Sequence, residues 1–159
     1  MAFRIVVGYD GSDGAKAALD EAIDLARRLS AKVLLTYAYG GPRTYTGESL
    51  APRGTLEELG ETLLDDARAL GERLLGEALT RSGDGVSIEP VLVDDGPAQG
   101  LLTVARQQRA QMIVVGTHGE SPIGAMVLGS TAYKLVHSTT KPVLVVPAAR
   151  RRRKAVRPA

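Results

Sequence analysis

Short apolar runs alternate with longer amphipathic stretches along this chain. The apolar runs cover residues 3–7, 32–37, 86–93, 112–115 and 143–146, and most of them stop at glycine, proline or a polar turn. Runs of this length with such boundaries are typical of buried β-strands. The pattern therefore predicts five strands separated by longer segments.

Apolar residues recur at helical spacing between the predicted strands. Ser12 can cap a helix that ends near Leu29, and Pro97 fits the first turn of a later one. Another helix is expected from about Gly129 to Ser138. Residues 40–54 read as a loop, and Thr55–Glu58 as a capping box. The helix after this box has one predicted apolar stripe: Leu56, Leu59, Leu63, Ala67, Leu70, Leu74 and Ala78.

The resulting order, βαβαβαβαβ, is typical of an α/β fold with a single doubly wound, five-stranded parallel sheet and helices on both faces. Right-handed crossovers restrict the topology, and we predict the strand order 3-2-1-4-5. Ligands of such sheets bind beyond the carboxyl ends of the strands where the order reverses. Binding residues are thus expected just after Val7 and just after Val115.

The charge of the chain changes this picture little, because it is concentrated at one end. The formal net charge is +2 and the pI is about 9.0. Residues 150–159 hold six of the 20 lysines and arginines and none of the 18 acids, so residues 1–149 carry 14 basic and 18 acidic residues, a net charge of −4. We therefore predict a folded domain over residues 1–148 and a basic, disordered tail over 149–159, which can contact nucleic acid weakly through phosphates.

The absence of cysteine excludes disulfides, thiolate metal sites and a cysteine nucleophile. The residues before Gly8 lack the basic region and long apolar region of a signal peptide. No run approaches the roughly 20 apolar residues needed to span a bilayer. The expectation is a cytoplasmic protein without membrane contact.

A glycine-rich pattern follows the fourth predicted strand. Gly116 and Gly119 are followed after nine residues by Gly129 and Ser130, which open the last predicted helix. Glycine lets the backbone approach a phosphate, and a helix N-terminus offers N–H groups and a favourable dipole. The pattern favours a polyphosphate site; the alternative is that Gly116 and Gly119 only form a tight turn.

Two more residues end strands near the predicted crevice. Asp10 can accept hydrogen bonds from a ribose or help to hold a cation, or it can simply stabilise the turn before Ser12. The backbone of Tyr37 can pair with a base edge, while its ring can equally serve packing.

Other candidates are weaker. His118 either touches a phosphate or faces solvent. Asp94 and Asp95 are interpreted as a turn that caps the helix at Pro97. No nucleophile has an evident base, so no catalytic residue is assigned, and metal ligands stay unassigned.

The complete phosphate pattern G-x2-G-x9-G-[S/T] at Gly116, Gly119, Gly129 and Ser130 resembles the ATP-binding branch of the universal stress protein family. The resemblance runs from about Phe3 to Pro147 and includes the opening at 6–12 and the closing segment at 141–147. It implies an ATP-binding stress-response protein that acts as a sensor or regulatory binding module, with Mg²⁺ as the companion of ATP. By the same resemblance, the ligand contacts are Asp10, Tyr37, Val115, Gly116, Gly119, Gly129 and Ser130.

The resemblance also implies a homodimer through the last strand, Val143, Leu144, Val145 and Val146. Gln111 departs from the family, where an acid usually precedes the fourth strand, and we expect a changed structural contact outside the pocket. Alternatives to ATP binding alone are slow ATP hydrolysis or self-phosphorylation, and binding of AMP or cyclic AMP. No Lys or Arg lies between Gly116 and Ser130, which argues against efficient hydrolysis.

Overall fold

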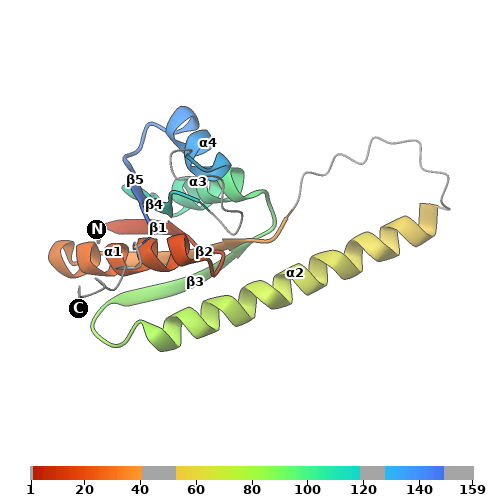
Figure 1. Ribbon diagram of the computed structural model, residues 1–159, viewed down its shortest axis with the longest axis horizontal. Coiled ribbons are helices and arrows are strands. Elements are labelled where there is room, and N and C mark those ends of the chain that lie inside the picture. Colours follow the sequence, from red (N-terminus) through yellow and green to blue (C-terminus); the bar gives the residue numbers. More distant parts are fainter. Residues whose placement is uncertain (1, 41–52, 119–127, 149–159) are drawn as a thin grey trace, which may run out of the picture.

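The computed structural model describes residues 2–40, 53–118 and 128–148. In these ranges strands and helices alternate along the chain (Figure 1). The strands are β1 (Arg4–Gly8), β2 (Lys32–Ala38), β3 (Ser87–Val93), β4 (Met112–Gly116) and β5 (Val143–Val146). The helices are α1 (Asp13–Leu29), α2 (Arg53–Arg81), α3 (Pro97–Gln107) and α4 (Ser130–Ser138).

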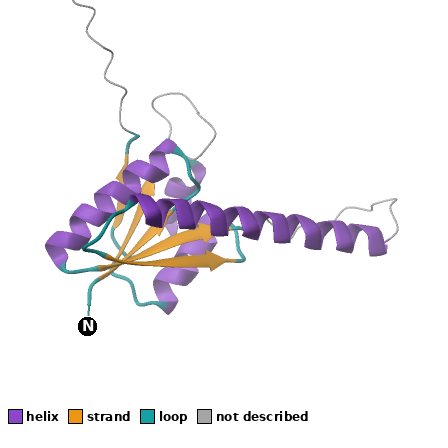
Figure 2. Cartoon of the chain, turned by 90° about the horizontal axis from the view of Figure 1, so that it is seen from below, coloured by secondary structure: helices purple, strands orange, loops and turns teal. Residues whose placement is uncertain are grey.

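The strands form one parallel sheet in the order β3-β2-β1-β4-β5, which confirms the predicted topology. β1 is central: Ile5 pairs with Val33 on one side and Met112 on the other. Figure 2 shows the strands fanning out with the right-handed twist expected of such a sheet. The order reverses between β1 and β4, so the carboxyl ends of these two strands diverge into separate helices on opposite faces.

Two apolar clusters fill the space between the sheet and its helices. Val7, Val33 and Leu35 face one layer together with α1 and the end of α2. Val6, Leu34 and Ile113 face the other layer with α3 and α4. Alternation along each strand thus sends neighbouring side chains into opposite layers, and this explains why the strands are apolar on both faces.

Helix α1 begins and ends where its sequence predicts. The Ser12 hydroxyl oxygen accepts a hydrogen bond from Ala15 N at 3.2 Å, which makes Ser12 the N-cap. The helix closes at Ser30, whose φ of 51° lies in the left-handed region and lets Ala31 N donate to Ala26 O. The predicted cap is therefore confirmed.

Helix α2 differs from its prediction. It begins at Arg53, so Thr55 lies inside the helix and is not its N-cap. The predicted apolar stripe is also wrong over its first half, because Leu59, Leu63 and Leu70 are exposed. The buried positions of α2 are Gly71, Leu75 and Ala78. Of the predicted loop at 40–54, residues 41–52 lie outside the described residues, whereas residues 53 and 54 belong to α2; the side chain of Leu56 is not described either.

The reason for this difference is the length of α2 relative to the sheet. Figures 1 and 2 both show its N-terminal half running beyond the strands, while its C-terminal half lies along β2 and β3. A leucine in the projecting half has no sheet beneath it, whatever its helical spacing.

Two smaller expectations are settled at the ends of α3 and β4. The N-cap of α3 is Gly96, so the prediction that the aspartates cap this helix is wrong; Asp95 instead stabilises the turn by accepting from Gly96 N at 2.8 Å. The Gln111 side chain accepts from Arg4 N at 2.7 Å, at the end of the sheet opposite the carboxyl ends of the strands. The departure at Gln111 is therefore a structural contact outside the pocket, as predicted. No helix in the described ranges is both long and apolar enough to cross a membrane.

Candidate functional site

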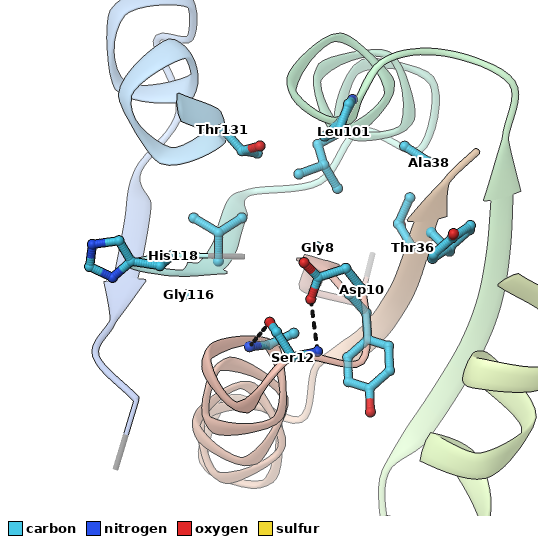
Figure 3. Close-up of a pocket in the computed structure, with 14 residues that line it drawn as sticks. Gly8, Asp10, Ser12, Thr36, Ala38, Leu101, Gly116, His118 and Thr131 are labelled. Carbon is cyan, nitrogen blue, oxygen red and sulfur yellow. Dashed lines mark hydrogen bonds between the residues drawn. The ribbon is translucent and has the colours of Figure 1, made fainter. Parts of the chain in front are cut away.

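A cleft opens at the carboxyl ends of β1, β2 and β4, where the strand order reverses (Figure 3). It holds about 570 Å³ of empty space, part of which is open to solvent. Its described lining is Gly8, Tyr9, Asp10, Ser12, Ala15, Thr36, Tyr37, Ala38, Pro97, Leu101, Val115, Gly116, His118 and Thr131.

The beginnings of three helices contribute to this lining. Ser12 and Ala15 belong to the start of α1, Pro97 opens α3, and Thr131 lies in the first turn of α4. The N-cap of α4 is Gly129, which has no side chain to accept from the N–H groups of the first turn. Unpaired N–H groups and the helix dipole favour an anion at such an end. The cleft is therefore suited to a ligand with a negatively charged group.

Asp10 follows β1 and lines the cleft, as predicted from its position. One carboxylate oxygen accepts from Ser12 N at 2.9 Å, which fixes the turn that carries the chain into α1 (Figure 3). The turn role of Asp10 is therefore confirmed, and its half-buried carboxylate lies at the cleft, where ligand contact stays a prediction. It can accept hydrogen bonds from a hydroxyl group of a ligand there.

Gly116 lines the cleft for a reason that the phosphate pattern alone does not reveal. A Cβ on Gly116 would meet the carbonyl carbon of Gly14 at 2.6 Å, and one on Gly14 would meet His118 O at 2.7 Å. The end of β4 and the start of α1 therefore touch backbone to backbone. Glycine at both positions holds the two halves of the cleft together.

Tyr37 lines the cleft, and its ring also packs against a helix. A Cβ on Gly71 of α2 would collide with the Tyr37 ring, so the ring fills the layer between β2 and α2. Its neighbour Thr36 points to the other face of the strand and is buried, with its hydroxyl donating to Leu34 O at 3.2 Å. The packing role of the Tyr37 ring is therefore confirmed, while pairing of its backbone with a base edge stays a prediction.

The rest of the glycine-rich pattern is only partly described. Gly129 N donates to Thr117 O at 2.6 Å, which brings the start of α4 against the end of β4. Gly129 and Ser130 are not among the described lining residues, and their neighbour Thr131 is. Gly119 lies outside the described residues. Val115, the other predicted contact, lines the cleft.

Sequence reasoning missed the apolar wall opposite Asp10. Leu101 of α3 is buried and lines the cleft with Ala38. A Cβ on Gly8 would meet Leu101 Cδ1 at 2.9 Å, so α3 approaches the end of β1 closely. The helical spacing of Leu101 indicated a core position, but nothing in the spacing showed that its side chain borders a cleft.

The electrostatics of the lining are unusual for an anion site. None of its described residues is lysine or arginine, and Asp10 adds a negative charge. Figure 3 shows the His118 ring directed away from Asp10; its Nδ1 lies 3.1 Å from Thr117 Oγ1, and its Nε2 is buried. His118 as a whole is half-buried, so the solvent-facing alternative describes it only in part. Burial raises the pKa of Tyr9 above 10.0, partly offset by the positive charge of Arg81.

No group of three or more His, Asp or Glu side chains gathers as a metal site in the described part of the chain. Asp10 is the carboxylate of the described lining. A divalent cation would therefore have to take most of its ligands from a bound molecule or from water.

Comparison with known proteins decides the family. The model of the universal stress protein family matches residues 1–147. The chain belongs to this family. A universal stress protein of Thermus aquaticus is 35% identical over 143 residues, which cover 89% of this chain and 96% of the relative. The universal stress protein YxiE of Bacillus subtilis is 29% identical over 148 residues, covering 90% and 97%.

Solved structures of universal stress proteins share the fold. One, determined in complex with cAMP, has a TM-score of 0.61 and 26% identity, and covers 93% of this chain and 98% of that one. A structure from Archaeoglobus fulgidus with dAMP has a TM-score of 0.51 at 23% identity, over 92% and 97% of the two chains. One from Arabidopsis thaliana with AMP bound has a TM-score of 0.63 at 14% identity, over 93% of each.

Proposed function

We propose that this universal stress protein binds an adenine nucleotide, with ATP as its ligand, in the cleft between β1 and β4, and acts as a regulatory module of the stress response. The observation that carries the proposal is the cleft itself. It lies at the reversal of strand order and combines an apolar wall with the uncapped start of α4. Structures of three family members with cAMP, dAMP or AMP support an adenine ligand.

The lining fits such a ligand in shape and in donors. Leu101, Val115 and the backbone of Tyr37 offer an apolar slot for a flat base. Asp10 is suited to a ribose hydroxyl. The first turn of α4, with the Thr131 hydroxyl, would receive the phosphates, and Gly116, Gly119, Gly129 and Ser130 complete the expected phosphate contacts.

ATP is preferred over AMP and cAMP in this proposal because the pattern from Gly116 to Ser130 is long enough to follow more than one phosphate. Mg²⁺ would enter with the phosphates, with Asp10 as the available carboxylate of the described lining. Binding without efficient turnover is the favoured activity, since the described lining offers no lysine or arginine to stabilise charge in a transition state.

Isothermal titration with ATP, AMP and cAMP tests the proposal. Asp10→Ala removes both the turn contact and the carboxylate, and should weaken ATP binding about 10-fold or more, the scale of one charged hydrogen bond. Asp10→Asn keeps an oxygen that can accept from Ser12 N but removes the negative charge. It therefore separates loss of the turn contact from loss of the carboxylate. Asp13→Asn removes an exposed carboxylate outside the lining and is the matched control. Absence of heat with every adenine ligand would refute the proposal.

Slow hydrolysis is the alternative within the same cleft. Steady-state phosphate release by the intact chain should not exceed that of the Asp10→Ala variant. A clear excess would show that the cleft turns ATP over.

We also propose a homodimer through β5. Its four residues are half-buried, and β5 stands at the edge of the sheet with pairing to β4 on one side. Edge strands that keep apolar residues are suited to pairing with another chain. The cytoplasmic location expected from the sequence, and nucleic-acid contact by residues 149–159, stay predictions.

A further inference from the structure

Helix α3 forms the apolar side of the cleft. Pro97 at its start and Leu101 one turn later both belong to the lining. Figure 3 shows the Leu101 side chain directed from this helix toward Gly8 at the end of β1. The height of α3 above the strand ends therefore determines where this wall of the cleft stands.

Gly100 lies where α3 closely approaches the ends of β2 and β3. A Cβ on Gly100 would meet Val93 Cγ1 at 2.8 Å and Ala38 Cβ at 3.2 Å. The first distance is shorter than real Cβ contacts, so one of the two partners would have to shift. Val93 is β-branched, and its short, stiff side chain leaves little room to turn away. A larger residue at position 100 would therefore push α3 away from the strands.

The backbone conformation does not require glycine at position 100. The glycines with positive φ in the described ranges are Gly11, Gly83 and Gly85, whereas Gly100 lies within α3 and its N–H donates to Gly96 O at 2.7 Å. Alanine is more favourable than glycine in the interior of a helix. What the glycine provides at this position is the close approach of α3 to the strands.

The next residue carries this close approach into the cleft. Leu101 is buried, and its Cδ1 would lie 2.9 Å from a Cβ on Gly8. Val115 Cγ1 would lie 3.0 Å from the same Cβ, so these two apolar side chains of the lining close over the end of β1. Because Gly100 and Leu101 are adjacent in one helix, a displacement of the helix at Gly100 also moves the Leu101 side chain.

Resting on the proposed function, we propose that Gly100 is a positioning residue for the base of the nucleotide. By letting α3 lie close to β2 and β3, it keeps Leu101 near enough to the strand ends to pack against a flat base. Dispersion contacts weaken steeply once a gap of about 0.5–1 Å opens between packed atoms. The phosphates would bind elsewhere, at the first turn of α4, so AMP and ATP should depend on Gly100 equally.

Gly100→Ala tests this role by isothermal titration with AMP and ATP. The added methyl group should displace α3 and weaken the binding of both ligands by the same factor, about 3- to 10-fold. Gly76→Ala is the matched control, because a Cβ at this helical glycine meets nothing within 4 Å, and it should leave both affinities unchanged. Circular dichroism verifies that each variant is folded, so that lost stability is not mistaken for lost affinity.

A second substitution separates positioning from a general packing defect. Val93 lies outside the described lining, and Val93→Ala removes the atom that the new Cβ would meet. Combined with Gly100→Ala, it should recover most of the lost affinity, while Val93→Ala alone should bind both ligands like the unchanged protein. A packing defect without a positioning role would instead grow with the second truncation, and absence of recovery would overturn the proposal.

The remaining outcomes also decide. Unchanged affinity of folded Gly100→Ala for both ligands overturns the proposed role, as does a loss that is larger for ATP than for AMP. If Gly100→Ala does not fold, Leu101→Val draws the same wall back without a new contact, and unchanged binding in that variant has the same meaning. A chain that binds AMP and ATP whatever residue stands at position 100 overturns only this role, whereas an unsubstituted chain that binds no adenine ligand overturns the proposed function as well.

Discussion

Individual glycines at the cleft are required by packing before any ligand is considered. Gly11 has a φ of 80°, a conformation that other residues rarely adopt, and it lets the chain turn from β1 into α1. Gly14 and Gly116 permit a backbone contact between α1 and β4. Gly116, which the sequence pattern assigned to a phosphate contact, is thus also required by packing.

Gly14→Ala tests this contact. The new methyl group would lie 2.7 Å from His118 O, so we expect a loss of about 1–3 kcal/mol in the free energy of unfolding. Gly76→Ala is the control, because a Cβ there meets nothing within 4 Å. It should stabilise α2 by about 0.4–1 kcal/mol. Urea denaturation of both variants gives the comparison, and equal effects would contradict the packing argument.

Tyr9 makes stability depend on pH at the alkaline end. Burial, the largest cause, raises its pKa above 10.0 in the folded protein. The folded state therefore retains a proton that the unfolded state loses, and the stabilisation present below pH 10.0 is lost as pH rises through the folded pKa. In the Tyr9→Phe variant, the free energy of unfolding should fall less steeply between about pH 9 and pH 11 than in the unchanged protein. Urea denaturation at each pH measures this difference. Tyr133→Phe, at a tyrosine that is 56% exposed, is the control.

At the scale of elements, α2 shows how far periodicity can be trusted. Its leucines keep helical spacing along the whole predicted stripe, yet Leu75 is 2% exposed while Leu63 is 60% exposed. Periodicity indicates which residues share a face, but burial requires a partner surface beneath that face. β2 and β3 supply this surface only to the C-terminal half of α2.

A pair of substitutions in α2 makes this difference measurable. Leu75→Ala should cost about 2–5 kcal/mol of unfolding free energy, because it removes buried side-chain volume. Leu63→Ala should change it by less than about 0.5 kcal/mol, as for most surface substitutions. A large loss at Leu63 in urea denaturation would indicate that another surface covers the projecting half of α2.

At the scale of the molecule, the two edges of the sheet differ. α2 lies along the β3 edge, whereas β5 ends the sheet at the other side (Figure 1). β5 keeps four apolar residues and carries no charge to discourage pairing. The dimer proposed above would form through this β5 edge.

The proposed assembly predicts a mass of twice 16.8 kDa in sedimentation equilibrium. Leu144→Lys places a charge on the edge strand and should shift the protein toward the mass of one chain. Leu63→Lys adds the same charge on α2, at the other edge, and should leave the mass unchanged. Circular dichroism verifies that both variants stay folded, and an unchanged mass for Leu144→Lys would exclude pairing through β5.

The sequence by itself determined the elements and their order. Apolar runs bounded by glycine and proline marked the strands, and Ser12 marked the start of α1. The alternation of elements limited the sheet topologies, and the strand order predicted among them is confirmed. These features are local or follow from the handedness of crossovers, so they can be predicted from the sequence alone. The position of Asp10, Val115 and Gly116 at the cleft followed from the same topology.

Only the tertiary structure decided which faces and groups meet. The exposure of Leu63, the backbone contact of Gly14 with Gly116 and the apolar wall at Leu101 all depend on elements distant in sequence. Helical spacing and glycine content carry no information about how far a helix projects past a sheet or which backbone it touches. The projection of a helix and its backbone contacts depend on the lengths, twist and packing of the assembled layers. These properties exist only once the chain has folded.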